Sequence, residues 1–156
     1  MASIQLNEIR LLGLNPTLYT TPLQFSFSCT VIEELPEALE VRFVWVGSGN
    51  TAAYDQVLET LLIGPLFVGI NEFVTDVAPP QWDLFPAMDI LGDTLLLVSL
   101  LYSEREFLRV GYWVHVAYVS DYDNTHPPQT ICIDRINRLL SSPTIIYMGE
   151  IPQDAI

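Results

Sequence analysis

The chain has 156 residues, half of them hydrophobic and 16% charged, a balance typical of an ordered globular domain. Nineteen acidic residues stand against six arginines and no lysine, giving a net charge near −13. This charge repels phosphate, which argues against direct nucleic-acid binding and favours basic partners, although it would equally serve solubility alone. We expect one domain over residues 1–156, with a short C-terminal end at 149–156 that is a candidate for disorder.

Cysteine usage and hydropathy indicate a reducing compartment and no membrane partner. Cys29 and Cys132 flank Trp45 with a spacing that fits the disulfide of a secreted immunoglobulin domain poorly. The N-terminal residues "MASIQLNEIR" contain no apolar signal segment, so we expect two free thiols. The most apolar run, "TLLLVSLLY" at 94–102, is far shorter than the roughly 20 residues of a membrane-spanning helix, and we predict a central strand there.

Short runs rich in β-branched and aromatic residues, separated by Pro and Gly, predict an all-β antiparallel sandwich or barrel with at most short helices in loops. Segment 54–62 fits either a helix or a loop followed by a strand. Segment 134–140 fits a short helical turn with Ile136, Leu139 and Leu140 inward. The predicted strands are 4–13, 23–32, 39–47, 66–75, 94–103, 106–119, 129–133 and 144–148.

The strand "EREFLRVGYWV" at 104–114 has one unusual face. Because successive side chains of a strand point to opposite sides, Leu108, Val110, Tyr112 and Val114 form an ordinary core face. The other face carries Phe107, Arg109, Gly111 and Trp113 in a row. We expect Gly111 to leave a shallow gap between Arg109 and Trp113, into which a partner helix can place an apolar side chain. The alternative is an internal salt bridge for Arg109 and a half-buried Trp113.

Chemistry-bearing motifs are scarce. His115 and His126 have no neighbours at metal-ligand spacing, and the chain has no phosphate-binding loop and no nucleophile elbow. Asp121 and Asp123 are the one candidate acid–base pair, and they lie in a polar loop where acidic residues are common. We therefore predict neither a catalytic residue nor a metal or other cofactor, and we expect that the protein is not an enzyme.

Three motifs resemble those of the anti-silencing-function family of histone chaperones. They are "YDQVLETLLIGP" (54–65), "EFLRVGYWV" (106–114) and the prolines of "HPP" (126–128), in matching order across most of the chain. The resemblance implies an elongated immunoglobulin-like β-sandwich without cofactors. It implies that the protein binds a dimer of histones three and four, masks the surface by which two dimers form a tetramer, and hands the dimer on in nucleosome assembly and disassembly. The implied location is the nucleus, with a cytoplasmic pool.

The same resemblance implies two sets of histone-binding residues. Arg109 and Trp113 fall on the histone-docking surface of the family, and the last strand is expected to add the tail of histone four as a further strand. Both basic positions of that strand are missing here, replaced by Thr144 and Tyr147. The implied histone-binding residues are Asp55, Asp89, Leu95, Leu97, Tyr102, Arg109, Trp113, Thr144, Ile145 and Ile146. Leu95 and Leu97 cannot share a face with Tyr102 on a regular strand, so we predict a bulge near Ser99 or a strand end at Leu101 that reconciles their directions.

A second surface implied by the resemblance binds basic hairpin segments of downstream histone chaperones. A pair of acidic residues is central to it in the family, but here the matching positions are Glu37 and Ala38, so one acid is missing. The remaining implied contacts are Glu59, Leu61, Ile63 and Phe73. The alternative function is an extracellular or carbohydrate-binding β-sandwich module, which would need an export signal and a disulfide.

Overall fold

The computed structural model describes residues 3–149 and residue 151 as two antiparallel sheets packed face to face. The three-stranded sheet has the order β1-β3-β6, and the seven-stranded sheet has the order β2-β9-β8-β7-β4-β5 with β10 paired to β8. The strands are β1 (Ile4–Leu12), β2 (Thr17–Leu18), β3 (Leu23–Val31), β4 (Leu39–Trp45), β5 (Gln56–Ile63), β6 (Gly69–Val77), β7 (Gly92–Tyr102), β8 (Arg105–Tyr118), β9 (Ile136–Leu140) and β10 (Thr144–Met148).

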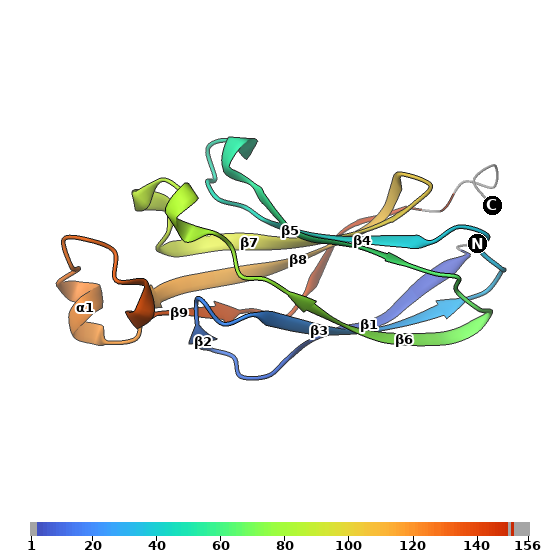
Figure 1. The fold of residues 1–156 in the computed structure, drawn as a ribbon, viewed down its shortest axis with the longest axis horizontal. Helices are drawn as coiled ribbons and strands as arrows, with labels where there is room; N and C mark the ends of the chain where they lie inside the picture. The colour runs from blue at the N-terminus through green and yellow to red at the C-terminus, as the bar shows by residue number, and fades with distance from the viewer. Residues whose placement is uncertain (1–2, 150, 152–156) are drawn as a thin grey trace.

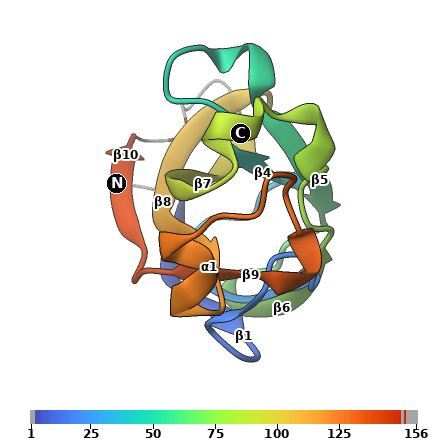
Figure 2. The same cartoon turned by 90° about the vertical axis from the view of Figure 1, so that its left-hand side faces the viewer.

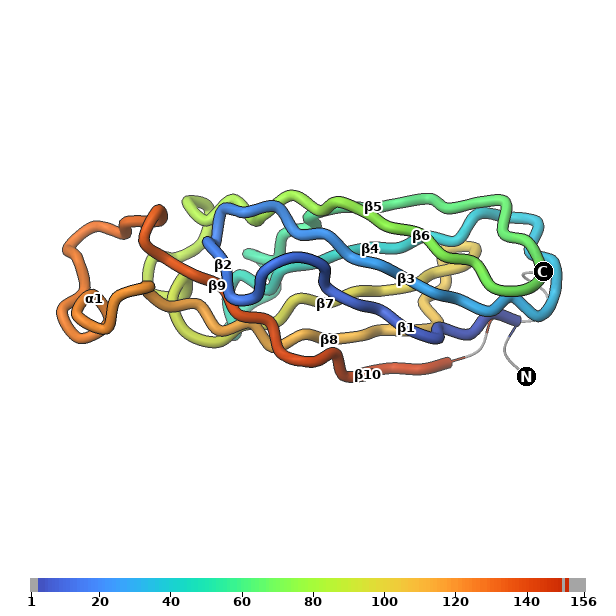
Figure 3. Tube along the Cα trace, turned by 90° about the horizontal axis from the view of Figure 1, so that it is seen from below, coloured from blue at the N-terminus to red at the C-terminus, as the bar shows by residue number. Residues whose placement is uncertain are grey.

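The sandwich is elongated, with its helical turns at the loop ends (Figure 1). Seen along its length, the seven-stranded sheet curls around the core from β5 to β9 (Figure 2). β10 runs along the outer margin beside β8, at the end opposite α1 (Figure 3). The helical elements are α1 (Asp121–Thr125) and four 3-10 turns, η1 (Ala52–Tyr54), η2 (Trp82–Leu84), η3 (Ala87–Asp89) and η4 (Ile133–Arg135).

Alternating side chains build the core between the sheets. In β3 and β4 every second residue is buried, as the pattern of the sequence predicts for strands with one face inward. Aromatic rings of the two sheets meet there, with the centroid of Phe25 5.2 Å from that of Phe43 and 5.6 Å from that of Tyr112. The core face of β8 is confirmed, since Leu108, Val110, Tyr112 and Val114 are all buried.

Most predicted strands are confirmed, and the prediction of an all-β sandwich with short helices in loops holds. Segment 54–62 is a loop followed by β5, which decides between its two interpretations. The prediction of a strand at 129–133 is wrong, because these residues form a loop that leads into η4. β2 and α1, short elements of two and five residues, are not predicted from the sequence.

The helical turn predicted at 134–140 is confirmed only for Asp134 and Arg135, which belong to η4. Residues 136–140 form β9, with Ile136, Arg138 and Leu140 facing the core and Leu139 43% exposed. Arg138 is buried at a position that would ordinarily be apolar, so the alternation of the strand cannot be recognised from hydrophobicity. Its Nη2 donates hydrogen bonds to the carbonyl oxygens of Thr21 and Pro22 at 3.1 and 3.4 Å. Burial lowers the pKa of this guanidinium.

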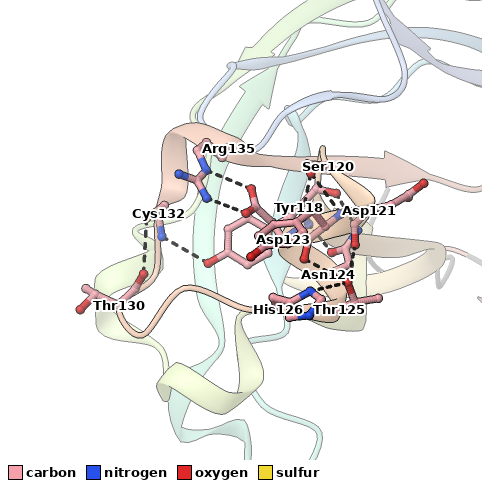
Figure 4. A network of polar contacts seen from close by, with 11 residues as sticks. Tyr118, Ser120, Asp121, Asp123, Asn124, Thr125, His126, Thr130, Cys132 and Arg135 are labelled. Atoms are coloured by element: carbon pink, nitrogen blue, oxygen red, sulfur yellow. Dashed lines mark hydrogen bonds and ion pairs between the residues drawn. The ribbon is translucent and has the colours of Figure 1, made fainter.

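The loop at the α1 end is held by a network of polar contacts (Figure 4). Ser120 caps α1 by accepting hydrogen bonds from the backbone of Tyr122 and Asp123. Arg135 donates to both carboxylate oxygens of Asp123 at 3.0 and 2.7 Å, which raises the pKa of this arginine. The Asn124 side chain donates to the carbonyl of Tyr118 and accepts from its amide. These contacts give Asp123 a structural role.

Cys29 and Cys132 are both free thiols, as expected, and Cys29 is buried. Within residues 3–149, no helix is long and apolar enough to cross a membrane.

Of the C-terminal end predicted at 149–156, the structure describes Gly149, whose amide donates to the carbonyl of Phe107, and Ile151, which is buried. The rest of that segment lies outside the described residues.

Candidate functional site

The outer face of the seven-stranded sheet brings the predicted side chains of β7 and β8 together in rows. Leu95 pairs across the strands with Trp113, and Leu97 pairs with Gly111. In the next row, Ser99 of β7 pairs with Arg109 of β8. Because paired residues of antiparallel strands share one face, these side chains form a continuous surface, which we call the recognition face.

Trp113 is the most prominent side chain of the recognition face. It is 59% exposed, although large aromatic residues are usually much more buried. Both polar groups of its backbone are bound to Ser141, because its amide donates to Ser141 Oγ at 3.0 Å and its carbonyl accepts from the Ser141 amide at 2.9 Å. Leu95 and Leu97 beside it are partly exposed. A fixed, exposed tryptophan next to aliphatic residues is typical of the centre of a protein interface.

Arg109 forms an ion pair within the chain. Its Nη2 lies 2.8 Å from Oε1 of Glu106, and the arginine side chain remains 42% exposed. Exposed pairs of this kind contribute about 0–1 kcal/mol to stability, so the guanidinium can exchange Glu106 for a partner carboxylate at little cost. Both interpretations of Arg109 are therefore partly correct, since it makes an internal salt bridge and also presents a charge.

Two of the predicted acidic residues lie on loops that border the recognition face. Asp55 is exposed at the end of η1. It directly precedes Gln56, the first residue of β5, which pairs with Trp45. Asp89 is partly exposed and ends η3. Both loops rise from the seven-stranded sheet on the side away from the three-stranded sheet (Figure 1). The acidic residues thus belong to the same side of the molecule as Trp113.

The gap expected over Gly111 is filled by the chain itself. A Cβ atom placed on Gly111 would meet the side chain of Ile146, whose Cγ1 would stand 3.2 Å away. The pairing of β10 with β8 shifts register between Ile145 and Tyr147, so Ile146 is the bulged residue. The side chain that occupies the gap therefore belongs to β10, which corrects the expectation of an open gap for a partner.

Tyr102 does not lie on the recognition face. It is 1% exposed, on the core side of β7, and its hydroxyl accepts a hydrogen bond from the Glu37 amide at 3.0 Å. The predicted bulge near Ser99 or strand end at Leu101 is not found, because β7 continues to Tyr102. A register shift between Leu100 and Leu101 does occur, but its extra residue is Phe107 of β8. It turns Phe107 into the core, at 5% exposure, and leaves Tyr102 buried. The expectation that Tyr102 contacts a partner is therefore corrected, and we assign Tyr102 a structural role.

β10 is an exposed strand at the margin of the sheet. All five of its residues are exposed, including Ile145, Ile146 and Tyr147 at 58%, 49% and 47%. Within the described part of the chain, β8 is the strand that pairs with it, so its other edge is open. Open edges with uncharged, β-branched residues readily accept another strand.

The residues of the predicted second surface lie on the side of the sandwich opposite β10, at the edges formed by β5 and β6. Glu59, Leu61 and Ile63 of β5 pair with core residues of β4 and so point inward at an edge strand. Phe73 of β6 stacks on Phe27, with ring centroids 4.8 Å apart. Figures 2 and 3 show β5 and β6 on the same side of the molecule. Glu37 is exposed in the loop before β4 and accepts a hydrogen bond from Ser103 Oγ.

The recognition face also includes residues that are not predicted from the sequence. Val44 of β4 pairs with Leu97 and is partly exposed, and the alternation of segment 39–47 could have indicated it. Asp93 and His115 form a cross-strand pair one row beyond Trp113. In the described residues no group of three or more His, Cys, Asp or Glu side chains could hold a metal ion.

Comparison with known proteins identifies the family. The family model described as "ASF1 like histone chaperone" matches residues 1–148. The chain belongs to this family of histone chaperones. It is 38% identical over 138 residues to histone chaperone ASF1 of Coccidioides immitis, which covers 88% of this chain and 50% of the relative. The corresponding protein of Saccharomyces cerevisiae is 36% identical over 138 residues, covering 88% of this chain and 49% of the relative.

Membership confirms the resemblance found in the sequence and agrees with the immunoglobulin-like sandwich. The ASF1-like histone chaperones are not a class of enzymes, and the ion pair with Arg135 gives Asp123, one member of the candidate acid–base pair, a structural role. The chain spans about half the length of the curated relatives it matches.

Proposed function

We propose that this chain is a histone chaperone that binds one dimer of histones three and four through the recognition face. The observation that carries the proposal is the exposed Trp113 beside Leu95 and Leu97, on a face bordered by Asp55 and Asp89, in a member of the ASF1-like family. A basic, helical partner matches this surface, because its apolar residues can cover Trp113 while its charges face the acidic residues.

The binding would act by masking. A chaperone that covers the surface by which two histone dimers form a tetramer keeps the dimer separate until it is handed on in nucleosome assembly or disassembly. The open edge of β10 supports a second contact, in which the tail of histone four adds as a strand alongside Thr144, Ile145 and Ile146. The missing basic residues of β10 make this contact depend on backbone pairing. Such a protein acts in the nucleus, with a cytoplasmic pool.

The second surface, at the β5 and β6 edges, is the proposed site for basic hairpin segments of downstream chaperones. It combines Glu37 and Glu59 with the apolar Leu61, Ile63 and Phe73, which suits a ligand with both basic and apolar residues. The protein needs no cofactor for either role, and its net charge disfavours direct contact with nucleic acid.

Co-purification and titration with a recombinant dimer of histones three and four test the main proposal. Leu95→Arg places a charge in the centre of the recognition face and should abolish binding, with a loss of about 2–4 kcal/mol or roughly 30- to 1000-fold. Val74→Arg is the matched control, because Val74 is a 58% exposed aliphatic residue on the other sheet. A Leu95→Arg variant that folds and binds like wild type would refute the proposed surface. A salt series separates the ionic share of the affinity.

A further inference from the structure

A hollow of about 260 Å³ lies beside Trp113 at one end of the recognition face. It follows from the strand register, because Asp93 of β7, His115 of β8 and Leu139 of β9 pair across three neighbouring strands. These three residues therefore form one row of the outer face, directly beyond the row of Leu95 and Trp113. The lining of the hollow is Asp93, Trp113, His115, Leu139, Leu140 and Ser141.

We propose that this hollow binds an arginine side chain of the histone partner. This inference rests on the proposed function and names the chemistry with which one end of the recognition face selects its ligand. The carboxylate of Asp93 is the charged ligand group, Trp113 is the stacking surface, and Leu139 contacts the aliphatic stem.

The geometry of the acidic group supports a cationic ligand. Oδ1 of Asp93 lies 2.7 Å from Nδ1 of His115, and the side chains are 69% and 59% exposed. The contact with His115 orients the carboxylate through one oxygen, and within the described residues the second oxygen has no hydrogen-bond donor. An apolar side chain in the hollow would remove this pair from water without replacing its hydrogen bonds, which is unfavourable.

The aromatic wall favours arginine over lysine. A guanidinium is flat, so it can stack on an indole ring while it donates hydrogen bonds to a neighbouring carboxylate. A lysine ammonium is a compact charge without such a plane, and it is more strongly hydrated. Trp113 is 59% exposed and its backbone is fixed by Ser141, so the stacking surface is already in place.

The spacing also specifies where the arginine lies in the partner. Two residues along a strand span roughly 6.6 Å, which separates the row of Asp93 from the row of Leu95. On a helix, positions three or four residues apart are separated by about 5–6 Å on one face. A partner helix that places an apolar residue on Leu95 therefore brings an arginine three or four residues away to Asp93.

A double-mutant cycle with the recombinant dimer of histones three and four tests the proposal. Asp93→Asn keeps the shape of the side chain and removes the charge, so we expect roughly 3- to 10-fold weaker binding at low salt and a smaller salt dependence. Glu72→Gln is the control, because it removes one exposed negative charge from β6 in the other sheet. We expect it to change the dissociation constant by less than about 2-fold.

The histone side of the cycle identifies the ligand. Arginines on the docking helix are changed one at a time to lysine, and one of them should weaken binding to wild type but not to Asp93→Asn. If no arginine couples to Asp93, or if Asp93→Asn binds like wild type, the arginine site is refuted. The arginine site can fail while the proposed function holds. This is the outcome if wild type binds the dimer and Leu95→Arg abolishes binding, but Asp93 couples to no arginine. Absence of any dimer binding by wild type would instead refute the proposed function.

Discussion

Ile146 of β10 lies over Gly111 of β8, so that the glycine has no room for a side chain of its own. The Cγ1 atom of Ile146 would stand 3.2 Å from a Cβ on Gly111, and its Cδ1 atom would be closer still. The recognition face and the open edge strand are therefore joined at this contact. A side chain added at Gly111 should therefore displace β10 more than it disturbs the packing of the core.

Gly111→Ala should push Ile146 away and loosen β10. We expect the free energy of unfolding to fall by about 1–2 kcal/mol, because the added methyl overpacks a filled position. Amide hydrogen exchange at 144–148 should accelerate more than exchange in β7. Urea unfolding and exchange measured by mass spectrometry report the two effects.

The pairing with Ile146 can be checked by compensation. Gly111→Ala combined with Ile146→Ala should recover slow exchange in β10, because the shorter side chain makes room for the new methyl. Gly49→Ala is the control, since a Cβ there meets nothing within 4 Å. A stability loss for Gly49→Ala equal to that for Gly111→Ala would show that the effect is not the contact with Ile146.

The sequence was sufficient to predict the β-sandwich architecture and to identify which face of the central strands is buried in the core. Alternation in segments 23–32, 39–47 and 106–119 reflects a sandwich with one side of each strand inward, and the structure confirms it. Hydrophobicity could not reveal β9, because the buried Arg138 interrupts its apolar alternation. Arginine is rarely buried, so its presence in a strand predicts an exposed position even where, as at Arg138, the side chain is buried.

The candidate site was harder to predict, because it depends on contacts between distant segments. The sequence of β8 indicates an exposed row of Arg109, Gly111 and Trp113, but not that Ile146 covers the glycine. Similarly, the extra residue Phe107 turns inward only because β7 and β8 shift register, which no local pattern specifies. Family resemblance placed Tyr102 among the contacts, whereas the structure buries it.

The two thiols should differ in reactivity. Burial raises the pKa of Cys29 to about 11, and the thiolate is the reactive form, so its thiolate fraction near pH 8 is roughly a hundredfold below that of an ordinary cysteine. Cys132 is only half-buried. Iodoacetamide at pH 8 should therefore label Cys132 alone in the folded protein and both cysteines in urea, as measured by mass spectrometry. Rapid labelling of Cys29 without denaturant would contradict the buried position.

The same thiol links stability to pH. Its pKa is raised by folding, so the stabilising effect of keeping it neutral is complete below the ordinary value near 9 and is lost as pH rises through about 11. Cys29→Ala should remove this contribution to the pH dependence, although it also leaves a small cavity. Urea midpoints of both proteins at pH 8 and pH 10.5 measure the difference. An identical pH dependence would show that Cys29 does not contribute.

Arg138 should be more sensitive to truncation than to replacement by an apolar side chain. It is 2% exposed, and its Nε and Nη1 atoms have no hydrogen-bond partner in the described part of the chain. Arg138→Ala should lower the free energy of unfolding by about 2–4 kcal/mol, because it leaves a cavity. Arg138→Met fills most of the volume and removes the unpaired donors, so it should cost less than half as much. Equal losses in urea unfolding would contradict this account of the buried arginine.

Restoring an acidic residue at position 38 should strengthen binding at the second surface. Ala38 lies against Gly64, next to the exposed Glu37 in the loop before β4. Ala38→Asp should tighten binding of a synthetic basic hairpin peptide by roughly 3- to 10-fold at low salt, with the gain shrinking as salt is added. Isothermal titration measures the affinity, and thermal unfolding checks that the new side chain fits beside Gly64.

The matched control for that variant is Ala78→Asp, which adds the same charge at an exposed position after β6. Because net charge changes equally in both proteins, a gain confined to Ala38→Asp assigns the effect to the local pair of carboxylates. Equal gains for the two variants would mean that only long-range attraction is measured. A folded Ala38→Asp protein with unchanged affinity would show that the β5 and β6 edges do not bind basic hairpins through this pair of positions.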